Sequence, residues 1–396
     1  MGRESKIAAV KFATNPDRKQ ARQMLREIAT RRVPFTPREV DKPLILYGAG
    51  DLGKMAKEYF DLLGIPFLFV VDASPDGPRK DPFWAGIEIR GKAEVSAEQR
   101  ATALLAICVA TVPFTVISQP LFEQGWQDVV PFYDIAEAYL NRHPLSNGWH
   151  AGELNDLDLF GIDSVLYRWE DDVSRAHHMQ FVAWRCLREE WFFDLAPVNT
   201  RDRYFIPQVL SILHDHEVLV DVGAHHGEAI LKFIDIVKHK YKEILAIEPD
   251  EKNFSRLQKN LRDNPTADQS KLRLLTCALG STSGERRFYG GLGYVSQFSA
   301  AGQTEISVER LDDLSVAASF VKFHVEGWES SVFDGGLETI RKYRPILTVT
   351  SYHNREGLWY LPSQIMSCLE DYVYYFRLHS WQDGCSVIYA FPRERK

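Results

Sequence analysis

Apolar and polar residues alternate along the chain in a pattern that predicts strands followed by helices, and the pattern occurs twice. Short apolar runs at Leu44–Tyr47, Phe67–Val71 and Leu104–Val109 are separated by stretches with helical spacing, and similar runs resume at Val218. Strands that alternate with helices are typical of parallel α/β units. The pattern therefore predicts two successive α/β regions, each built around a largely parallel sheet.

The same pattern divides the chain into segments. Residues 1–42 form a charged lead with helical spacing, and residues 43–150 form a smaller Rossmann-like α/β domain. Residues 151–203 are rich in aromatic side chains and predict a mostly helical bridge, after which residues 204–396 form a second α/β domain. The expected fold class is therefore α/β, with a doubly wound sheet in the C-terminal domain.

Composition narrows the classes of function. The chain has 396 residues, 45% of them hydrophobic, and a net charge of -7, which does not favour binding to nucleic acid phosphates. The longest apolar runs, Leu62–Val71 and Ala103–Phe114, are shorter than the roughly 20 residues that cross a bilayer. The cysteines form no CxxC pair and no apolar leader is present, so a cytoplasmic protein with free thiols is expected. No pattern indicates an oligomeric state.

The first glycine-rich loop has the spacing of a dinucleotide-binding turn. Gly48, Gly50 and Gly53 follow the strand Leu44–Tyr47 and open a helix, and Asp72 ends the next strand. In dinucleotide folds such glycines let the backbone approach a phosphate, and the acid binds ribose hydroxyls. The loop is therefore a candidate site for a nucleotide or nucleotide-sugar. A tight turn that packs without a ligand explains the same glycines.

A second glycine-rich turn, DVGAHHGE, follows the strand that begins at Val218 and lacks the dinucleotide spacing. Its looser form suits S-adenosylmethionine, which ends in an amino acid and carries no phosphate. Asp221 is expected to accept hydrogen bonds from the ammonium of that ligand, directly or through water. The cofactor-binding candidates in this turn are Asp221, Gly223, Ala224, His225, Gly227 and Glu228.

Two further strand ends are expected beside this turn. Glu248 follows the strand Glu243–Ile247, where a carboxylate can accept both ribose hydroxyls, and the next strand ends at Cys277, where an adenine is expected to pack. The carboxyl ends of parallel strands meet at one edge of a sheet, so these turns predict a single ligand crevice. The cofactor-binding candidates at these two ends are Glu248, Pro249, Cys277, Ala278 and Leu279.

Polar side chains gather at the ends of two later strands. Lys322, His324 and Glu326 alternate along one strand, and three polar residues on a core strand require partners. The strand Pro345–Thr350 delivers His353 to the same edge. The catalytic candidates are therefore Glu326, His324, His353 and Lys322, with a structural role at a helix N-terminus as the alternative for Glu326.

Taken together, these blocks resemble the FkbM family of S-adenosylmethionine-dependent methyltransferases. The resemblance covers about Tyr204 to Tyr389 and implies the class I methyltransferase fold, with a doubly wound seven-stranded sheet. It also implies methyl transfer, usually to a hydroxyl of a sugar, glycolipid or secondary metabolite. His324 stands where the family usually has Asp, so His324 either replaces that acid or alters the activity. The matching blocks are DVGAHHGE, IEPDEKNFSRLQKN, ALGSTSG, ERLDDL, VKFHVEGWES and RPILTVTSYH.

Two other classes of function stay open. An NAD(P)-dependent oxidoreductase would use the first glycine loop, although no residues suited to hydride transfer follow it. A non-catalytic cofactor-binding protein would keep the fold without turnover, and His324 is the departure that hints at it. For the expected methyltransferase, the acceptor is a small molecule or glycan. Trp359, Tyr360 and Trp381 are candidates to stack on a sugar ring, and a core position explains them better.

The histidines raise the question of a bound metal. His214 and His216 lie in a polar turn, and His225 and His226 are adjacent in a loop from which they point in different directions. No HxxxH or HxH motif comes with a third close ligand. We therefore expect no catalytic metal, and expect S-adenosylmethionine to be the cofactor.

Overall fold

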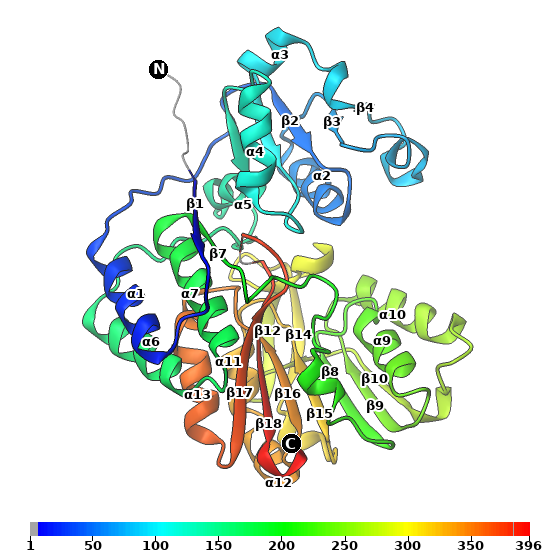
Figure 1. The fold of residues 1–396 in the computed structure, drawn as a ribbon. Helices are drawn as coiled ribbons and strands as arrows, with labels where there is room; N and C mark the ends of the chain where they lie inside the picture. Colours follow the sequence, from blue (N-terminus) through cyan, green and yellow to red (C-terminus); the bar gives the residue numbers. More distant parts are fainter. Residues whose placement is uncertain (1–6, 383) are drawn as a thin grey trace.

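The computed structural model describes residues 7–382 and 384–396, and two sheets organise that part of the chain (Figure 1). A five-stranded sheet lies in the N-terminal part, and a seven-stranded sheet lies in the C-terminal part. The α/β class predicted from the alternation of strands and helices is confirmed. No helix of the described residues is both long and apolar enough to span a bilayer.

The five-stranded sheet is parallel throughout, in the order β4-β3-β2-β5-β6. Leu44 and Leu46 of β2 face one apolar cluster, and Ile45 and Tyr47 face another, because successive side chains of a strand point to opposite faces. The strands are β2 (Leu44–Tyr47), β3 (Val70–Val71), β4 (Ile89–Arg90), β5 (Leu104–Ile107) and β6 (Val129–Pro131), and the helices are α2 (Asp51–Leu63), α3 (Ala97–Thr102), α4 (Phe114–Glu123) and α5 (Phe132–Ala136).

The seven-stranded sheet has the order β10-β9-β8-β15-β16-β18-β17 and is parallel except where β18 pairs with its two neighbours. The chain leaves β8 in one direction and later returns to its other side at β15, so a crevice is expected at the carboxyl end of β8. The strands are β8 (Glu217–Val222), β9 (Tyr241–Ile247), β10 (Leu272–Leu275), β15 (Phe320–Phe323), β16 (Ile346–Thr350), β17 (Tyr372–Leu378) and β18 (Ser386–Pro392).

Helices cover both faces of this sheet. Val218, Val220 and Val222 of β8 face one apolar cluster, and Leu219 faces the other. Two helices follow β15, and at Gly335, between them, a side chain would clash with the carbonyl oxygen of Gly280. The helices are α8 (Pro207–Leu210), α9 (Glu228–Ile236), α10 (Glu251–Asp263), α11 (Glu329–Asp334), α12 (Leu337–Tyr343) and α13 (Tyr360–Cys368).

A small four-stranded sheet is inserted between β10 and β15, in the order β11-β14-β12-β13. The loop between β12 and β13 carries Leu292 and Val295 into the same apolar cluster as Tyr59 and Phe60 of α2. The insertion therefore packs the C-terminal part of the chain against the region of the five-stranded sheet. Its strands are β11 (Ala278–Leu279), β12 (Gly284–Tyr289), β13 (Gln297–Phe298) and β14 (Thr304–Glu309).

The lead and the bridge pack together. The lead contains a strand that the helical spacing did not predict, β1 (Ala8–Phe12), and this strand pairs in parallel with β7 (Glu189–Phe193). The helix α1 (Arg18–Thr30) contacts α6 (Asp156–Arg168) and α7 (Asp172–Leu187). These helices lie beside α13 and β17 in Figure 1. The two segments thus form one layer against the C-terminal domain.

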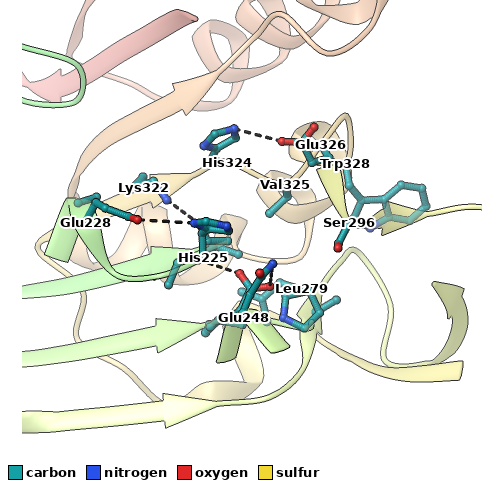
Figure 2. A pocket seen from close by; sticks show the side chains of 18 of the residues that line it. His225, Glu228, Glu248, Leu279, Ser296, Lys322, His324, Val325, Glu326 and Trp328 are labelled. Carbon is teal, nitrogen blue, oxygen red and sulfur yellow. Dashed lines mark hydrogen bonds and ion pairs between the residues drawn. The ribbon is translucent and has the colours of Figure 1, made fainter. Parts of the chain in front are cut away.

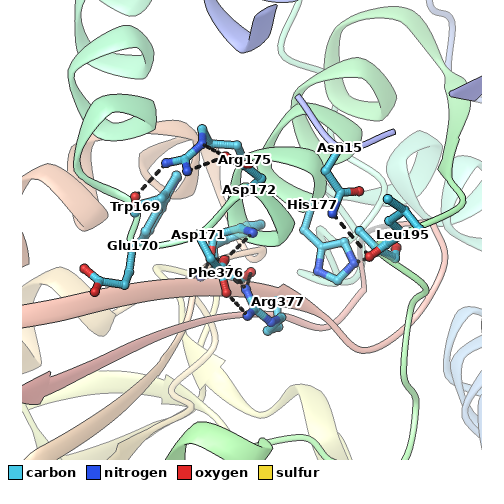
Figure 3. A network of polar contacts seen from close by, with 12 residues as sticks. Asn15, Trp169, Glu170, Asp171, Asp172, Arg175, His177, Leu195, Phe376 and Arg377 are labelled. Atoms are coloured by element: carbon cyan, nitrogen blue, oxygen red, sulfur yellow. Dashed lines mark hydrogen bonds and ion pairs between the residues drawn. The ribbon is translucent and has the colours of Figure 1, made fainter. Parts of the chain in front are cut away.

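Polar contacts fix α7 to the edge strand β17 (Figure 3). Asp171, the N-cap of α7, pairs with Arg377 at 2.6 Å, and the hydroxyl of Ser174 accepts the backbone N–H of Phe376 at 3.0 Å. The ring nitrogen Nδ1 of His177 accepts the backbone N–H of Leu378. The start of α7 is therefore held on β17 by hydrogen bonds, in addition to the apolar packing of the helix against the sheet.

Candidate active site

A cavity of about 360 Å³ lies at the carboxyl ends of β8, β9 and β15 (Figure 2). This volume is in the range of small-molecule sites. The small inserted sheet contributes apolar walls, with Phe288 and Phe298 facing the cavity. Of the residues predicted from the sequence, the cavity is lined by Gly223, Ala224, His225, Glu228, Glu248, Pro249, Cys277, Ala278, Leu279, Lys322, His324 and Glu326.

The glycine turn after β8 is pressed against the end of β15. Gly223 and Gly227 have φ values of 75° and 89°, in the left-handed region that favours glycine. A side chain at Gly223 would clash with the carbonyl oxygen of His324, and one at Gly227 would meet Leu257. Both glycines are therefore required by backbone conformation and by packing, and Gly227 lies behind the wall of the cavity.

Glu248 connects the turn to the end of β9. Its Oε2 atom accepts the backbone N–H of His225 at 2.8 Å, and its Oε1 atom accepts that of Asp250 at 3.0 Å. Burial raises the pKa of Glu248, and these backbone donors act in the opposite direction. A carboxylate can accept about four hydrogen bonds, so Glu248 keeps capacity for a ligand in the cavity.

Asp221 lies beneath the turn rather than on the cavity wall. Its Oδ1 atom lies 2.5 Å from Nζ of Lys322, which also donates to the carbonyl oxygen of Gly223 at 2.8 Å. Burial raises the pKa of Asp221, and the ammonium of Lys322 lowers it. Asp221 thus contacts a residue that lines the cavity, and its direct contact with a cofactor stays a prediction.

The catalytic candidates of β15 and β16 converge. Oε1 of Glu326 lies 3.2 Å from Nε2 of His324 and 3.3 Å from Nε2 of His353. Behind them, Nδ1 of His353 lies 2.7 Å from Oε1 of Glu329, a residue that the sequence reasoning left out. Figure 2 shows His324 and Glu326 facing each other at the wall. His353 lies behind that wall.

Charge is distributed unevenly within this group. Burial lowers the pKa of His324 to about 3, so its ring is neutral at pH 7. Burial acts to lower the pKa of His353 as well, but Glu326 and Glu329 raise it to about 10. Burial acts to raise the pKa of Glu326, and the two histidines bring it well below its ordinary value. His353 therefore holds a proton between two carboxylates.

The backbone at Glu326 is strained. Glu326 and Gly327 have φ values of 49° and 92°, so two consecutive residues are left-handed. For a residue other than glycine this conformation costs on the order of 1 kcal/mol, and such residues concentrate at functional sites. The bend follows directly after β15 and directs the carboxylate of Glu326 toward the two histidines.

Three residues that the sequence did not identify as site residues surround His324. The hydroxyl of Tyr204 lies 2.9 Å from Nδ1 of His324, and that of Tyr352 lies 3.0 Å from Nε2. Arg203 donates to the hydroxyl of Tyr352, and its buried Nε makes no hydrogen bond to the residues that the structure describes. Tyr204 and Arg203 come from the segment before β8, and Tyr352 follows β16, so the group forms only when these segments meet in the fold.

The first glycine loop lies away from the cavity. Asp72 accepts the backbone N–H groups of Ala49 and Ser74, both at 2.8 Å. A side chain at Gly53 would clash with the carbonyl oxygen of Gly48, whose φ is 104°. Hydrogen bonds within the turn thus occupy Asp72, and close packing of the backbone explains Gly53 without a ligand. Gly50 caps α2 without a side chain, and ligand binding at Gly48, Gly50, Gly53 and Asp72 stays a prediction.

The aromatic residues considered for sugar stacking do not line the cavity. The indole N–H of Trp359 donates to Asp158 at 3.0 Å, and Trp381 packs on Phe192 with ring centroids 4.8 Å apart. Tyr360 is exposed. The interpretation of the two tryptophans as packing residues fits these contacts.

Two groups of side chains in residues 7–382 and 384–396 have donor atoms close enough to share a metal ion. The first is His324, Glu326 and His353, and the second is His225, His226 and Glu228. The rings of His225 and His226 stack on each other at 3.5 Å, with carboxylate oxygens of Glu228 at 3.6 and 3.7 Å. His214 and His216 are exposed and belong to neither group.

Comparison with known proteins identifies the C-terminal part. Residues 221–376 match the family model of the methyltransferase FkbM domain. The crystal structure of methyltransferase FkbM from Methylobacillus flagellatus KT aligns over 93% of this chain and 93% of its own, with 19% identity and a TM-score of 0.57. This match shows a shared fold that extends over the N-terminal part of the chain. The resemblance seen in the sequence blocks is confirmed, and an oxidoreductase is not favoured.

Other solved structures align with about half of the chain. Precorrin-6y C5,15-methyltransferase from Geobacter metallireducens GS-15 covers 50% of this chain and 95% of its own, with 11% identity and a TM-score of 0.31. An rRNA methylase from Streptococcus thermophilus covers 46% and 92%, with 12% identity and a TM-score of 0.29. No curated protein sequence matches the chain significantly.

Proposed function

Because residues 221–376 carry a methyltransferase FkbM domain, we propose that this enzyme transfers a methyl group from S-adenosylmethionine to a hydroxyl oxygen of a sugar, glycan or similar small molecule. The observation that carries the proposal is the cavity at the carboxyl ends of β8, β9 and β15, which combines a glycine turn, a carboxylate and apolar walls. We assign the surrounding sheet to the class I methyltransferase arrangement, from its strand order.

The residues around the cavity fit this cofactor. Arg203 reaches the cavity with a buried Nε that lacks a hydrogen bond within the described chain, and a methionine carboxylate is the partner that it needs. Glu248 has capacity to accept the ribose hydroxyls, and the apolar surface at Ala278 and Leu279 suits an adenine. Gly223 lines the cavity and lets the turn lie against the end of β15, where a side chain would not fit.

His324 and Glu326 line the same cavity, and His324 is linked to Arg203 through Tyr352. When bound, S-adenosylmethionine supplies a methyl group on a positively charged sulfur, which keeps the bonding electron pair as the methyl carbon bonds to the acceptor oxygen. We assign His324 and Glu326 to hold the acceptor hydroxyl by hydrogen bonds, with its proton leaving to the carboxylate of Glu326. Fixed orientation of the reacting atoms supplies much of the rate in such displacements.

Positioning roles follow for the residues behind the wall. Glu329 and His353 hold Glu326 in place, and Lys322 fixes the carbonyl oxygen of Gly223. In the same proposal, residues 43–150 and 204–396 are separate domains, because the five-stranded sheet ends at Pro131 and the seven-stranded sheet begins at Glu217. Residues 151–203 link the two, and the lead packs on this link through β1 and α1.

A polar cleft supports a polar acceptor. This cleft of about 810 Å³ lies between α2 and the turn at His225, and it shares His225, Asn253 and Gly293 with the cavity. Charged side chains from both domains line it, including Lys54 and Arg256. Sugars and other hydroxyl-rich molecules suit such a cleft, because their hydroxyl groups can form hydrogen bonds with the charged and polar side chains that line it.

Calorimetric titration tests the cofactor assignment. We expect S-adenosylmethionine to bind wild type and the Gly48→Ala variant with similar affinity, and to bind Arg203→Ala at least tenfold more weakly. NADH serves as the second ligand. Binding of NADH through the first loop, with no binding of S-adenosylmethionine, would overturn the proposal. Formation of S-adenosylhomocysteine with a panel of hydroxylated sugars then tests turnover, and cofactor binding without turnover on any acceptor would favour the non-catalytic alternative.

A further inference from the structure

We propose that His324, Glu326 and His353 form a three-ligand site for a divalent transition-metal cation, whose open positions face the cavity. The inference rests on the proposed function in one respect: the open side of the cation would receive the oxygen atom of the methyl acceptor. The cation site itself depends on the placement of these side chains and not on that function.

The donor atoms have the separation that a shared cation requires. They all lie within 4.8 Å of one another, and Oε1 of Glu326 is 3.2 Å from Nε2 of His324 and 3.3 Å from Nε2 of His353. Zinc and similar cations bind nitrogen and oxygen ligands at about 2.0–2.2 Å, which places neighbouring ligands roughly 3–3.5 Å apart. The three side chains therefore need little movement to bind one ion.

The residues behind His353 resemble the support of a metal-binding histidine. Metal-bound histidines usually donate their second ring N–H to a carboxylate, which fixes the tautomer and the ring orientation. Nδ1 of His353 lies 2.7 Å from Oε1 of Glu329, and the same oxygen accepts the hydroxyl of Thr350 at 2.8 Å. Nε2 of His353 is buried, makes no hydrogen bond within the described residues, and is directed toward Glu326.

His324 is oriented in a similar way from the other side. Its Nδ1 atom lies 2.9 Å from the hydroxyl of Tyr204, and the Nε2 atom is on the side of Glu326. The hydroxyl of Tyr352 also lies 3.0 Å from Nε2, and this hydrogen bond is the one that a cation would replace. His324 and Glu326 line the cavity, so the open side of the ion would face the bound ligands.

The charges favour a cation at this position. Glu326 and Glu329 are two nearly buried carboxylates, and neither forms an ion pair with a Lys or Arg of the described chain. Buried charges require a partner of opposite sign, and a divalent cation bound by Glu326 would supply one. Two imidazoles and one carboxylate with open positions select first-row transition metals, such as Zn²⁺, Co²⁺ and Fe²⁺, over Mg²⁺ or Ca²⁺.

Titration of the metal-free full chain with Co²⁺ tests the proposal, with visible absorption and calorimetry as readouts. We expect one Co²⁺ per chain, displaced by Zn²⁺, and no binding of Mg²⁺ at the same concentration. Glu326→Gln and His324→Gln are expected to weaken Co²⁺ binding at least 100-fold. Glu329→Gln removes only the support of His353, and should weaken binding by about 10- to 100-fold.

Matched variants separate this site from the alternatives. His324→Asp keeps a metal-binding side chain and should retain Co²⁺ binding that His324→Gln loses. His214→Gln, at an exposed histidine, should leave the titration unchanged. Loss of Co²⁺ in His226→Gln but not in His324→Gln would move the ion to the other cluster and overturn the proposal. Absence of Co²⁺ binding to wild type at stoichiometric concentration would also overturn it.

Titration with S-adenosylmethionine distinguishes this failure from failure of the proposed function. Variants that bind S-adenosylmethionine like wild type have a folded cavity, so their loss of Co²⁺ reports on the ligands themselves. Wild type that binds S-adenosylmethionine and no Co²⁺ contradicts only the metal site. Wild type that binds Co²⁺ and no S-adenosylmethionine contradicts only the proposed cofactor.

Discussion

Nζ of Lys322 lies 2.5 Å from Oδ1 of Asp221, directly beneath the glycine turn that borders the cavity. Both side chains are buried, and the ammonium also donates to the carbonyl oxygen of Gly223 at 2.8 Å. The pair therefore connects β8 with β15 and holds the turn between them. Removal of one partner from a buried ion pair leaves an uncompensated charge, which typically costs about 3–5 kcal/mol.

We expect Lys322→Met to lower the free energy of unfolding by about 3–5 kcal/mol, because Asp221 is left buried without its partner. Unfolding by urea, followed by circular dichroism, measures the change. The double variant Asp221→Asn, Lys322→Met removes both charges and should be more stable than the sum of the single effects predicts. Strict additivity of the two substitutions would contradict the assigned pairing.

Gly223→Ala is expected to disrupt the turn beyond its conformational cost. A methyl group at Gly223 would clash with the carbonyl oxygen of His324, whereas Gly64 has a similar positive φ and open space around it. Gly64→Ala should therefore lose only about 1–2 kcal/mol through the left-handed conformation. We expect a larger loss of stability for Gly223→Ala, together with loss of S-adenosylmethionine binding in calorimetry.

Equal loss of stability in the two glycine variants would show that the turn can move away from β15 at no cost. It would also weaken the argument that this turn has a fixed shape for a cofactor. Gly64→Ala is expected to bind S-adenosylmethionine like wild type, because Gly64 ends α2 in the other domain.

Glu248→Gln should reduce the affinity for S-adenosylmethionine, because a neutral amide accepts hydrogen bonds from the ribose less strongly than a carboxylate. Hydrogen bonds to charged groups contribute about 1.5–3 kcal/mol, which corresponds to roughly 10- to 150-fold in the dissociation constant. Glu243→Gln, on the strand that precedes Glu248 and outside the cavity, is the matched control. Similar affinity in both variants, measured by calorimetry, would contradict the role of Glu248.

The sequence predicted the parts of the fold that depend on local patterns. Strand β2 has the predicted bounds Leu44–Tyr47, and β9 ends at the predicted residue, Ile247. Apolar runs and glycine turns are determined by neighbouring residues, so they are visible in one sequence. Strand β1 could not be predicted in this way because its partner, β7, is far along the chain.

The candidate site shows the same division between local and distant information. Glu326 and His324 were identified because they alternate on one strand end. Their contacts with Tyr352, Arg203 and the Glu329 carboxylate behind His353 depend on how β15, β16 and the segment before β8 meet in space. A search for short histidine motifs could not find a group whose members come from the segments after two neighbouring strands.

The buried residue His178 of α7 should make the free energy of unfolding depend on pH in the acid range. Nδ1 of His178 accepts the indole N–H of Trp169 at 3.0 Å, and Nε2 lies 2.8 Å from the carbonyl oxygen of Leu358, so the neutral ring satisfies both groups. Burial lowers the pKa of His178 to about 4, below the value of about 6.5 expected in the unfolded chain. The unfolded chain therefore binds more protons between these two values.

Stability should accordingly fall as the pH decreases from about 7 toward the pKa of the folded state. At pH 5 the unfolded chain gains about 2 kcal/mol from protonation of this histidine, since 1 pH unit corresponds to about 1.4 kcal/mol. Urea unfolding of wild type at pH 7.5 and 5.0 gives the total change, to which the buried His177 also contributes. His178→Gln is less stable at neutral pH but should lose about 2 kcal/mol less on acidification. An equal loss in both proteins would mean that His178 is already protonated in the folded state.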